Sequence, residues 1–303
     1  MTVSEQYPII DPHHHYWDPV LNNHPWLSGP EPIKFRYGDY SALRNKPFLP
    51  ADYAAISASW NVVATATMEG EWDPADPVGE VEWLSGLREQ QGVPAAHAAQ
   101  AWLDSGDLEA TLETISAFDF VRSVRHKPIA SVSPASGTQG GMCDSAFRSG
   151  FSLLSKYALH FELQTPWWHL HEARHLIARD ERTLVILNHT GLPSDRSAEG
   201  LAGWLLAMKE FAALPQTCVK ISGLGIVGQR WSLASNRDII RYTIDLFGPE
   251  RCMFASNFPV DGLIGDFDTI YNGYWDIAAS YSEAERHALF AGTAARVYSI
   301  DIL

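Results

Sequence analysis

The sequence has few cysteines and no long apolar run. Its three cysteines, Cys143, Cys218 and Cys252, are an odd number among 303 residues, and no two of them stand in CxxC spacing. This pattern argues against a disulfide framework and against a thiolate metal site. Nowhere do about 18 apolar residues follow one another, as a membrane helix requires, and the first ten residues do not resemble a secretory signal. We therefore expect a soluble cytoplasmic protein with ordinary buried or half-buried thiols.

Positive charge is also scarce. The chain carries 22 Lys and Arg against 36 Asp and Glu, a formal net charge of −14. Such a charge repels phosphate backbones and anionic lipid surfaces, so nucleic acid and membrane partners are not expected. An apolar content of 46% provides for a large core. We expect one domain over residues 1–303 that binds a small molecule rather than a macromolecule, and a homo-oligomer only because such assemblies are common among cytoplasmic proteins.

Short apolar runs rich in β-branched residues alternate with helical stretches along the chain. Eight strands are predicted, at residues 7–15, 61–69, 93–103, 120–126, 159–165, 183–191, 217–223 and 251–257. The helices between them are predicted at residues 76–91, 106–118, 146–158, 170–180, 197–214, 236–248 and 281–300. The last begins with Ser282 and Glu285 in capping-box spacing.

This alternation predicts an α/β fold, a (β/α)8 TIM barrel with a long loop after strand one. A doubly wound open sheet is the second choice. It is weakened because no Gly-rich phosphate fingerprint such as GxGxxG follows the first strand.

The first strand ends in three consecutive histidines. Because side chains alternate across a strand, His13 and His15 should share the inner face while His14 faces the helices. Asp11 has the same parity and could orient an imidazole. Two imidazoles at this spacing can converge on one metal ion, but they can equally be polar strand-end residues that hydrogen-bond to neighbouring loops.

Polar groups also stand at the ends of other strands, where a barrel carries its chemistry. They are Glu69, Arg125, Gln164, His189, Lys220 and Asn257. Together they predict a pocket at the carboxyl ends of the strands.

Five motifs, "IIDPHHH", "VILNHTGLP", "VKISG", "FGPERCMFASNFPVD" and "AARVY", carry a resemblance to a known family. From Ile9 to about Tyr298 the chain resembles the amidohydrolase superfamily, specifically the amidohydrolase-2 group of TIM-barrel hydrolases. That group includes L-fuconolactonase, 2-pyrone-4,6-dicarboxylate lactonase and 4-sulfomuconolactone hydrolase. The resemblance implies that His13 and His15 form the strand-one pair, that His189 is the strand-six histidine, and that the strand-eight segment holds the general base.

The chain departs from the family pattern at that base. Relatives usually carry an aspartate where this sequence has Asn257, and an amide cannot accept a proton from water as a carboxylate does. Asp261 in the same loop, Glu69 at the end of strand two, or a histidine of the cluster could replace it. Asp261 could equally cap its loop, and Glu69 could equally pair with Arg125 or Lys220.

The cofactor is open in the same way. His13, His15 and His189 could hold one divalent ion, zinc first, with water in the fourth position. Operation without a metal, in which the same histidines donate hydrogen bonds to a substrate carbonyl, is the alternative.

Substrate contacts are expected from cations and aromatic loops. Arg125 and Lys220 could anchor a carboxylate or stabilise an oxyanion, with Gln164 beside them. The loop after strand one, residues 16–53, is dense in aromatic residues, and Trp167 follows strand five. These residues could wall a pocket for a flat ring, although core packing explains any one tryptophan as well.

We therefore expect a hydrolase, a lactonase that opens a cyclic ester of a carboxylated or sugar-derived small molecule. Arg125, Gln164, Trp167 and Lys220 would bind the substrate, and Glu69 or Asp261 would accept a proton near His189 and Asn257. Two alternatives remain: a metal-dependent decarboxylase of an aromatic acid, and a catalytically inactive barrel that only binds a small molecule.

Overall fold

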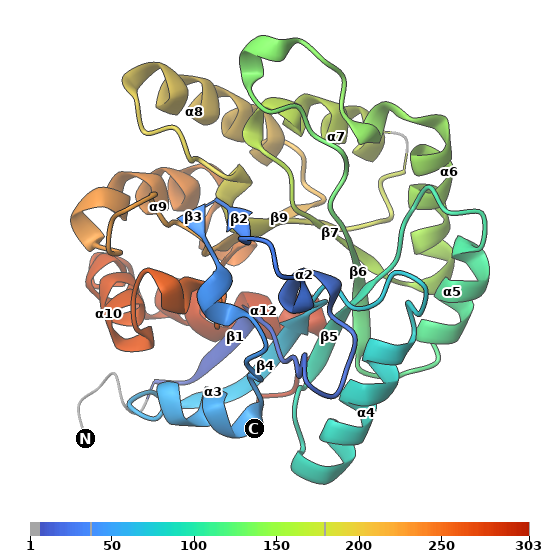
Figure 1. Cartoon of the computed structure of the whole chain (residues 1–303). Coiled ribbons are helices and arrows are strands. Elements are labelled where there is room, and N and C mark those ends of the chain that lie inside the picture. The colour runs from blue at the N-terminus through green and yellow to red at the C-terminus, as the bar shows by residue number, and fades with distance from the viewer. Residues whose placement is uncertain (1–6, 37, 179, 303) are drawn as a thin grey trace.

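Eight parallel strands form one sheet that curls into a barrel (Figure 1). The computed structural model describes residues 7–36, 38–178 and 180–302, so position 37 of the predicted loop and position 179 of a predicted helix lie outside the described residues. The strands are β1 (Ile9–His14), β4 (Val62–Met68), β5 (Ala96–Gln100), β6 (Val121–His126), β7 (His160–Leu163), β8 (Val185–Leu187), β9 (Thr217–Ile221) and β10 (Cys252–Phe254). Each lies within its predicted range. The sequence-based prediction of a TIM barrel is confirmed.

The barrel closes where the first and last strands meet. In the sheet, β1 pairs with β4 and β10 pairs with β9. The gap between β1 and β10 is bridged by the backbone N–H of Asn257, which donates to the His13 carbonyl at 2.7 Å, and by the N–H of His15, which donates to the Phe258 carbonyl at 2.8 Å. The segment that carries Asn257 is therefore fixed to the histidine strand by its backbone.

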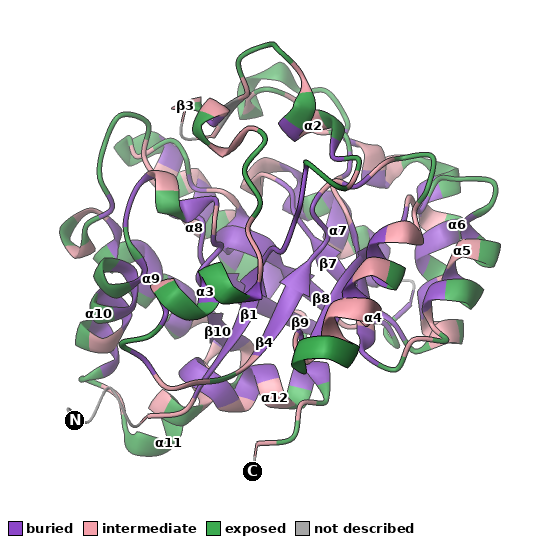
Figure 2. Ribbon diagram, turned by 60° about the horizontal axis from the view of Figure 1, so that its bottom comes forward, coloured by how far each residue is buried: buried purple, intermediate pink, exposed green. Residues whose placement is uncertain are grey.

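Most of the helices surround the strands on the outside, while others lie at the two ends of the barrel (Figures 1 and 2). They are α2 (Pro25–Ser28), α3 (Pro50–Ile56), α4 (Gly79–Gln91), α5 (Leu108–Ile115), α6 (Ser145–Leu154), α7 (Leu170–Ile177), α8 (Ala198–Ala212), α9 (Leu233–Phe247), α10 (Phe267–Ala278), α11 (Glu283–His287) and α12 (Thr293–Tyr298). The predicted capping box of Ser282 and Glu285 begins α11. None of these helices is long and apolar enough to cross a membrane, in the part of the chain that the structure describes.

The helices α10, α3 and α2 were not predicted from the sequence. The sequence of α10, "FDTIYNGYWDIA", is rich in aromatic and β-branched residues and contains a glycine, all of which lower helix propensity. Its formation depends on tertiary context, because Asp266 caps its first turn through the Thr269 N–H at 2.7 Å and its aromatic face is buried. Of the other two, α3 lies at the end of the long loop and α2 lies within it.

A register shift in β1 separates Asp11 from the histidines that follow it. Pro12 has no N–H for the ladder, and irregular pairing at such a residue changes which way the next side chains point. The Asp11 carboxylate accepts hydrogen bonds from the Tyr53 hydroxyl at 2.7 Å and the Ser256 N–H at 3.0 Å. The expectation that Asp11 orients an imidazole is therefore wrong: it joins β1 to α3 and to the loop after β10.

The N-terminal end of the barrel is filled by small and medium apolar side chains. Strand residues such as Ile10, Ile186 and Met253 pack there against Val297 and Tyr298 of α12. Figure 2 shows α12 below the strands, at the end opposite the mouth. The interior at this end is a packed core, so a ligand can enter only from the other end.

The loop after β1 covers the mouth of the barrel. It folds into α2 and a short hairpin of β2 (Lys34–Phe35) and β3 (Gly38–Asp39), and both views place these elements over the carboxyl ends of the strands (Figures 1 and 2). Within the loop, Trp17 pairs with Phe48 through backbone hydrogen bonds. Trp26 ties it to the barrel by donating from Nε1 to the Gly70 carbonyl at 2.9 Å.

Candidate active site

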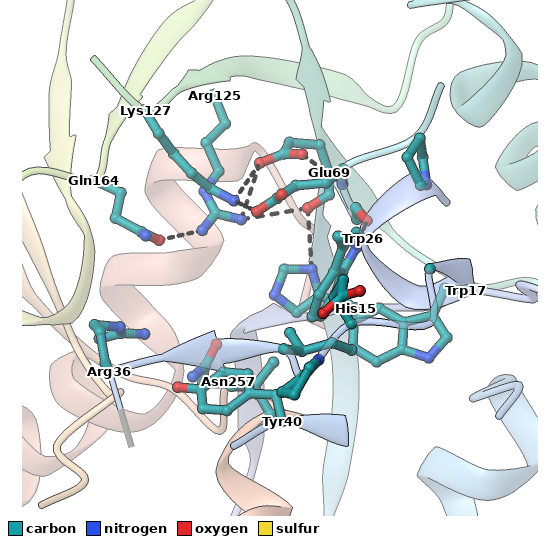
Figure 3. A pocket seen from close by; sticks show the side chains of 18 of the residues that line it. His15, Trp17, Trp26, Arg36, Tyr40, Glu69, Arg125, Lys127, Gln164 and Asn257 are labelled. Atoms are coloured by element: carbon teal, nitrogen blue, oxygen red, sulfur yellow. Dashed lines mark hydrogen bonds and ion pairs between the residues drawn. The ribbon is translucent and has the colours of Figure 1, made fainter. Parts of the chain in front are cut away.

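A cavity of about 440 Å³ opens at the mouth of the barrel beneath the long loop (Figure 3). Residues of the strand ends line it from below and residues of the loop line it from above. The strand-end residues are His15, Glu69, Gly70, Glu71, Arg125, Lys127, Gln164, His189, Asn257 and Val260, and the loop residues include Trp17, Trp26, Arg36 and Tyr40. The volume suits a small molecule of one or two rings.

Glu69, at the end of β4, stands among cationic groups. Its Oε1 lies 3.2 Å from Nη1 of Arg125 and 3.6 Å from Nζ of Lys127, and its Oε2 accepts the Glu71 N–H at 2.8 Å. Arg125 also donates to the Gln164 side-chain carbonyl, and Lys127 to the Glu71 carboxylate. Glu69 is only 3% exposed, so its carboxylate is held in one orientation at the edge of the cavity. Glu69 therefore forms the expected ion pair with Arg125 and also lines the cavity, where it could act on a substrate.

His15 presents one particular nitrogen to the cavity. Its Nδ1 lies 3.0 Å from the Met68 carbonyl and 3.1 Å from the Glu69 carbonyl, and a nitrogen between two carbonyl oxygens must carry the proton. Burial lowers the pKa of His15 well below its ordinary value, and the charges of Arg125 and Lys127 lower it further. The ring is therefore neutral, and its Nε2 is a hydrogen-bond acceptor.

His189 projects into the cavity from a tight turn after β8. The turn has left-handed backbone at His189, with φ of 54°, and the ring bonds through Nδ1 to the Ser222 hydroxyl at 2.9 Å. Gly223 is needed there, because a Cβ at residue 223 would lie 2.6 Å from the His189 ring and the glycine itself has φ of 63°. Burial, followed by the charges of Arg36 and Arg125, lowers the pKa of His189 well below its ordinary value. This ring too is neutral.

His13 lies behind these two imidazoles and does not line the cavity. Its ring centroid is 5.4 Å from that of His15 and 4.5 Å from that of His189, and neither of its ring nitrogens has a hydrogen-bond partner among the described residues. His14 points the other way and packs against Tyr53 at 4.4 Å between ring centroids. The structure thus brings the three expected histidines together and turns His14 toward the helices.

These histidines offer zinc the right donor type but not a completed site. Among the described residues, no group of three or more His, Cys, Asp and Glu side chains is arranged so that it could hold a metal ion. The charges nearby are also balanced without a dication: Arg125 pairs with Glu69, Lys127 with Glu71, and Lys220 with a carboxylate inside the barrel. The residues as arranged do not fit a three-ligand metal site.

Asn257 and Asp261 form a pair at the end of β10. The Asn257 amide donates from Nδ2 to Oδ1 of Asp261 at 2.7 Å, and the other Asp261 oxygen accepts the Gly223 N–H at 3.0 Å. Because the carboxylate can only accept, it fixes the amide with Nδ2 toward Asp261. Asn257 lines the cavity, but Asp261 does not. This position suits Asp261 to orienting Asn257 and Gly223 rather than to accepting a proton from a substrate water.

Lys220 and Trp167 lie away from the cavity. Lys220 is fully buried, 2.8 Å from the Glu162 carboxylate and 3.1 Å from the Met68 sulfur. Burial lowers the pKa of Lys220 to about 8, although Glu162 acts in the opposite direction. Trp167 packs its ring close to Gly203. Neither residue therefore contributes to the lining of the cavity, where the substrate contact was expected.

Several lining residues were not predicted as site residues, among them Arg36, Tyr40, Glu71 and Lys127. Arg36 and Tyr40 come from the long loop, and Glu71 stands two residues after Glu69 with φ of 55°. Lys127 stands two residues after Arg125, so the two side chains share a face and His126 lies between them in sequence. Lys127 could have been selected by its parity with Arg125. For the two loop residues the only signal was the length and aromatic content of the loop.

Comparison with known proteins agrees with this architecture. The sequence model of an amidohydrolase family (Amidohydro_2) matches residues 10–300. An uncharacterized protein of Sinorhizobium fredii is 34% identical over 96% of this chain and 98% of its own length, and an L-fucono-1,5-lactonase of Burkholderia multivorans is 28% identical over 96% of each. A crystal structure of an amidohydrolase from Burkholderia multivorans with bound zinc superposes with a TM-score of 0.78, at 24% identity over 97% of this chain and 99% of that one.

The family match spans nearly the whole chain and includes every strand, except for Ile9 at the start of β1, and every strand-end residue of the cavity. The barrel, the histidine pair of β1 and the histidine turn after β8 thus belong to one continuous match. The chain is a member of the Amidohydro_2 amidohydrolase family.

Proposed function

We propose that the protein is a lactonase that adds water to the carbonyl carbon of a cyclic ester and releases the open-chain hydroxy acid. The observation that carries this proposal is a buried carboxylate, Glu69, at the edge of a cavity in the barrel mouth whose lining also presents two neutral imidazoles, His15 and His189. A relative, 28% identical, is named an L-fucono-1,5-lactonase, which supports a sugar-derived lactone as the first substrate to test.

The attacking water is held by His15 and Glu69. The free Nε2 of His15 accepts one hydrogen bond from the water, since Nδ1 already donates to backbone carbonyls. Glu69 accepts the proton as the oxygen–carbon bond forms, and it returns this proton to the ring oxygen when the ester bond breaks. Atoms balance: one water enters, and one carboxylic acid and one hydroxyl are formed.

The developing oxyanion is stabilised by His189 and by the field of the cations. We assign the Ser222 hydroxyl as the donor to Nδ1, so that the neutral His189 ring carries its proton on Nε2 and donates it to the carbonyl oxygen. Arg125 is held rigidly by Glu69 and Gln164 and contributes positive potential without having to reorganise. Lys127, which is more exposed, is suited to contact a hydroxyl or carboxylate of the substrate.

Zinc is the cofactor suggested by the related crystal structure, which contains it. Among the described residues the donors do not form a group of three, the aspartate position holds Asn257, and the carboxylates Glu69, Glu71 and Glu162 are paired with cations. A dication beside Arg125 and Lys220 would be repelled without a compensating carboxylate. We therefore propose that turnover needs no metal.

The test is hydrolysis of a lactone panel by the purified protein, before and after dialysis against a chelator, with metal content measured on the same sample. The panel begins with L-fucono-1,5-lactone and includes 1,4- and 1,5-aldonolactones and carboxylated lactones. Acid release should persist after chelation with zinc far below stoichiometric. Glu69→Gln should lower kcat about 10²- to 10⁴-fold, whereas Glu82→Gln, an exposed residue on α4, should not change it.

The other outcomes separate the alternatives. Turnover that disappears with chelation and returns with zinc would refute the metal-free proposal but keep the lactonase. Carbon dioxide release from an aromatic acid would indicate the decarboxylase, and tight binding without turnover, with activity gained by Asn257→Asp, would indicate a barrel that only binds.

A further inference from the structure

A second cavity of about 300 Å³ adjoins the first and is not used by the reaction proposed above. The two cavities share six lining residues, Pro25, Trp26, Glu69, Glu71, Arg125 and Lys127. The second alone is lined by Trp72, Pro74, Gln100, Trp102 and His126. We call it the side cavity. It continues the main cavity toward the ends of β5 and β6.

His126 and Gln100, which line the side cavity, each have one hydrogen-bonding group available for a ligand. The Leu103 N–H donates to Nδ1 of His126 at 3.1 Å, and burial lowers the pKa of His126, so the neutral ring carries its proton on Nε2. Gln100 donates from Nε2 to the Trp72 carbonyl at 3.2 Å, which fixes the amide and leaves Oε1 as an acceptor. Among the described residues, neither His126 Nε2 nor Gln100 Oε1 has a partner. The side cavity thus offers one donor and one acceptor.

The rest of its surface is flat and apolar. Trp26, Trp72, Trp102 and Pro74 supply indole and pyrrolidine faces. Its charged residues are already paired, Lys127 with Glu71 and Arg125 with Glu69. Aromatic faces with a few convergent neutral polar groups suit an uncharged ring that carries hydroxyls, rather than an ion.

The border between the cavities includes an ion pair that can open at small cost. Side-chain exposure is 27% for Lys127 and 46% for Glu71, and a pair this exposed contributes roughly 0 to 1 kcal/mol. The deeper pair of Arg125 and Glu69 is 3% and 4% exposed and stays closed. A ligand could therefore span both cavities by displacing only the outer pair.

We propose that the side cavity binds an uncharged, hydroxyl-bearing second ring, so that the substrate is a lactone that carries a glycosyl substituent. This inference rests on the proposed function for the lactone ring in the main cavity. Trp102 and Gln100 act as specificity residues for the second ring, because both line the side cavity and neither lines the main one.

The test compares D-glucono-1,5-lactone with two of its 4-O-glycosylated forms, maltobiono-1,5-lactone and cellobiono-1,5-lactone, to cover both linkages. We expect kcat/KM for one glycosylated lactone to exceed that of gluconolactone at least about tenfold, a preference of about 1.4 kcal/mol. Trp102→Ala and, separately, Gln100→Ala should remove this preference and leave gluconolactone hydrolysis unchanged. Trp275→Ala, a half-buried tryptophan of α10, is the matched control and should keep the preference.

A binding measurement separates this inference from the proposed function. Calorimetry with the open-chain acids maltobionate, cellobionate and gluconate needs no turnover. If one two-ring acid binds more tightly than gluconate and Trp102→Ala removes the difference, the side cavity is a ring site even if no lactone is hydrolysed. Equal binding of all three acids, or an equal effect of Trp102→Ala and Gln100→Ala on one-ring and two-ring lactones, would overturn the inference.

Discussion

The buried histidine His97 should make the protein lose stability in mild acid. It is fully buried on β5, where its Nδ1 bonds the Thr67 hydroxyl at 3.0 Å, and burial lowers its pKa to about 3 from the ordinary 6.5. Between pH 6.5 and pH 3, His97 is therefore protonated in the unfolded chain but neutral in the folded chain. The stability contributed by the neutral ring is complete above pH 6.5 and is lost as the pH falls toward 3.

The magnitude follows from this difference of about 3.5 units. Below pH 3 the loss would approach about 4.8 kcal/mol, and at pH 5 it is about 2 kcal/mol. His97→Asn retains a hydrogen-bonding group near Thr67 but cannot be protonated. The drop in the free energy of unfolding between pH 7.5 and pH 5.0 should therefore be about 2 kcal/mol smaller in this variant than in the parent.

Equilibrium urea unfolding followed by tryptophan fluorescence at the two pH values measures this drop. Comparing each protein with itself cancels the packing cost of the substitution, which is the same at both pH values. His175→Asn, at an exposed position on α7, is the control and should show the drop of the parent. If His97→Asn also loses as much stability as the parent between pH 7.5 and 5.0, the assignment of a neutral buried ring is refuted.

Three further predictions concern the site and the barrel interior. Arg125→Lys should lower kcat/KM for the lactone about 10- to 100-fold, because an ammonium cannot keep both the contact to Glu69 and the one to the neighbouring glutamine; unchanged kinetics would contradict this role. Gly223→Ala should abolish most activity and destabilise the fold by about 1 kcal/mol or more, since its Cβ would meet the His189 ring, with circular dichroism to show that the barrel persists. Tyr298→Phe should lower the free energy of unfolding by about 1 to 3 kcal/mol, because a buried carboxylate loses its hydroxyl donor, and urea unfolding that shows no change would argue against that bond.

The periodicity of the sequence was enough to predict the eight strands and most of the outer helices. The strands are short, buried and separated by polar segments, so hydrophobic pattern and turn residues both indicated them. The helix α10 was missed because its residues have low intrinsic propensity and it forms through burial of an aromatic face, which single-sequence reasoning does not detect.

The site was predictable where strand parity holds and unpredictable where it fails. Parity placed His13 and His15 on one face, and their rings lie together in the structure. It misplaced Asp11, because Pro12 interrupts the ladder and the register shifts there. The position of Lys220 at a strand end likewise did not show that its side chain is fully buried. Its burial depends on the ion pair with Glu162 inside the barrel, which the sequence does not reveal.

The sequence did not predict which residues of the long loop line the cavity. Its aromatic content suggested a wall, and Trp17 and Trp26 are in it, but Trp167 points to a neighbouring helix instead. Which tryptophan faces a cavity is decided by the tertiary path of the loop. The role of Asp261 was undetermined for the same reason, because only the structure shows both of its oxygens accepting N–H groups.

The first strand, β1, is joined to the segment after β10, so the barrel cannot close during synthesis on a ribosome until that segment has been made. The His13 carbonyl has no hydrogen bond to Asn257 until that residue has been synthesised. The Glu162 carboxylate likewise lacks its hydrogen bond from the Tyr298 hydroxyl until α12 has been synthesised. A nascent chain that has emerged only as far as β9 has an open sheet with charged side chains in its interior, and it lacks the helix α12 that covers the N-terminal end of the barrel. We expect such chains to need protection from aggregation until α12 has emerged, and catalytic competence to arise only after that point.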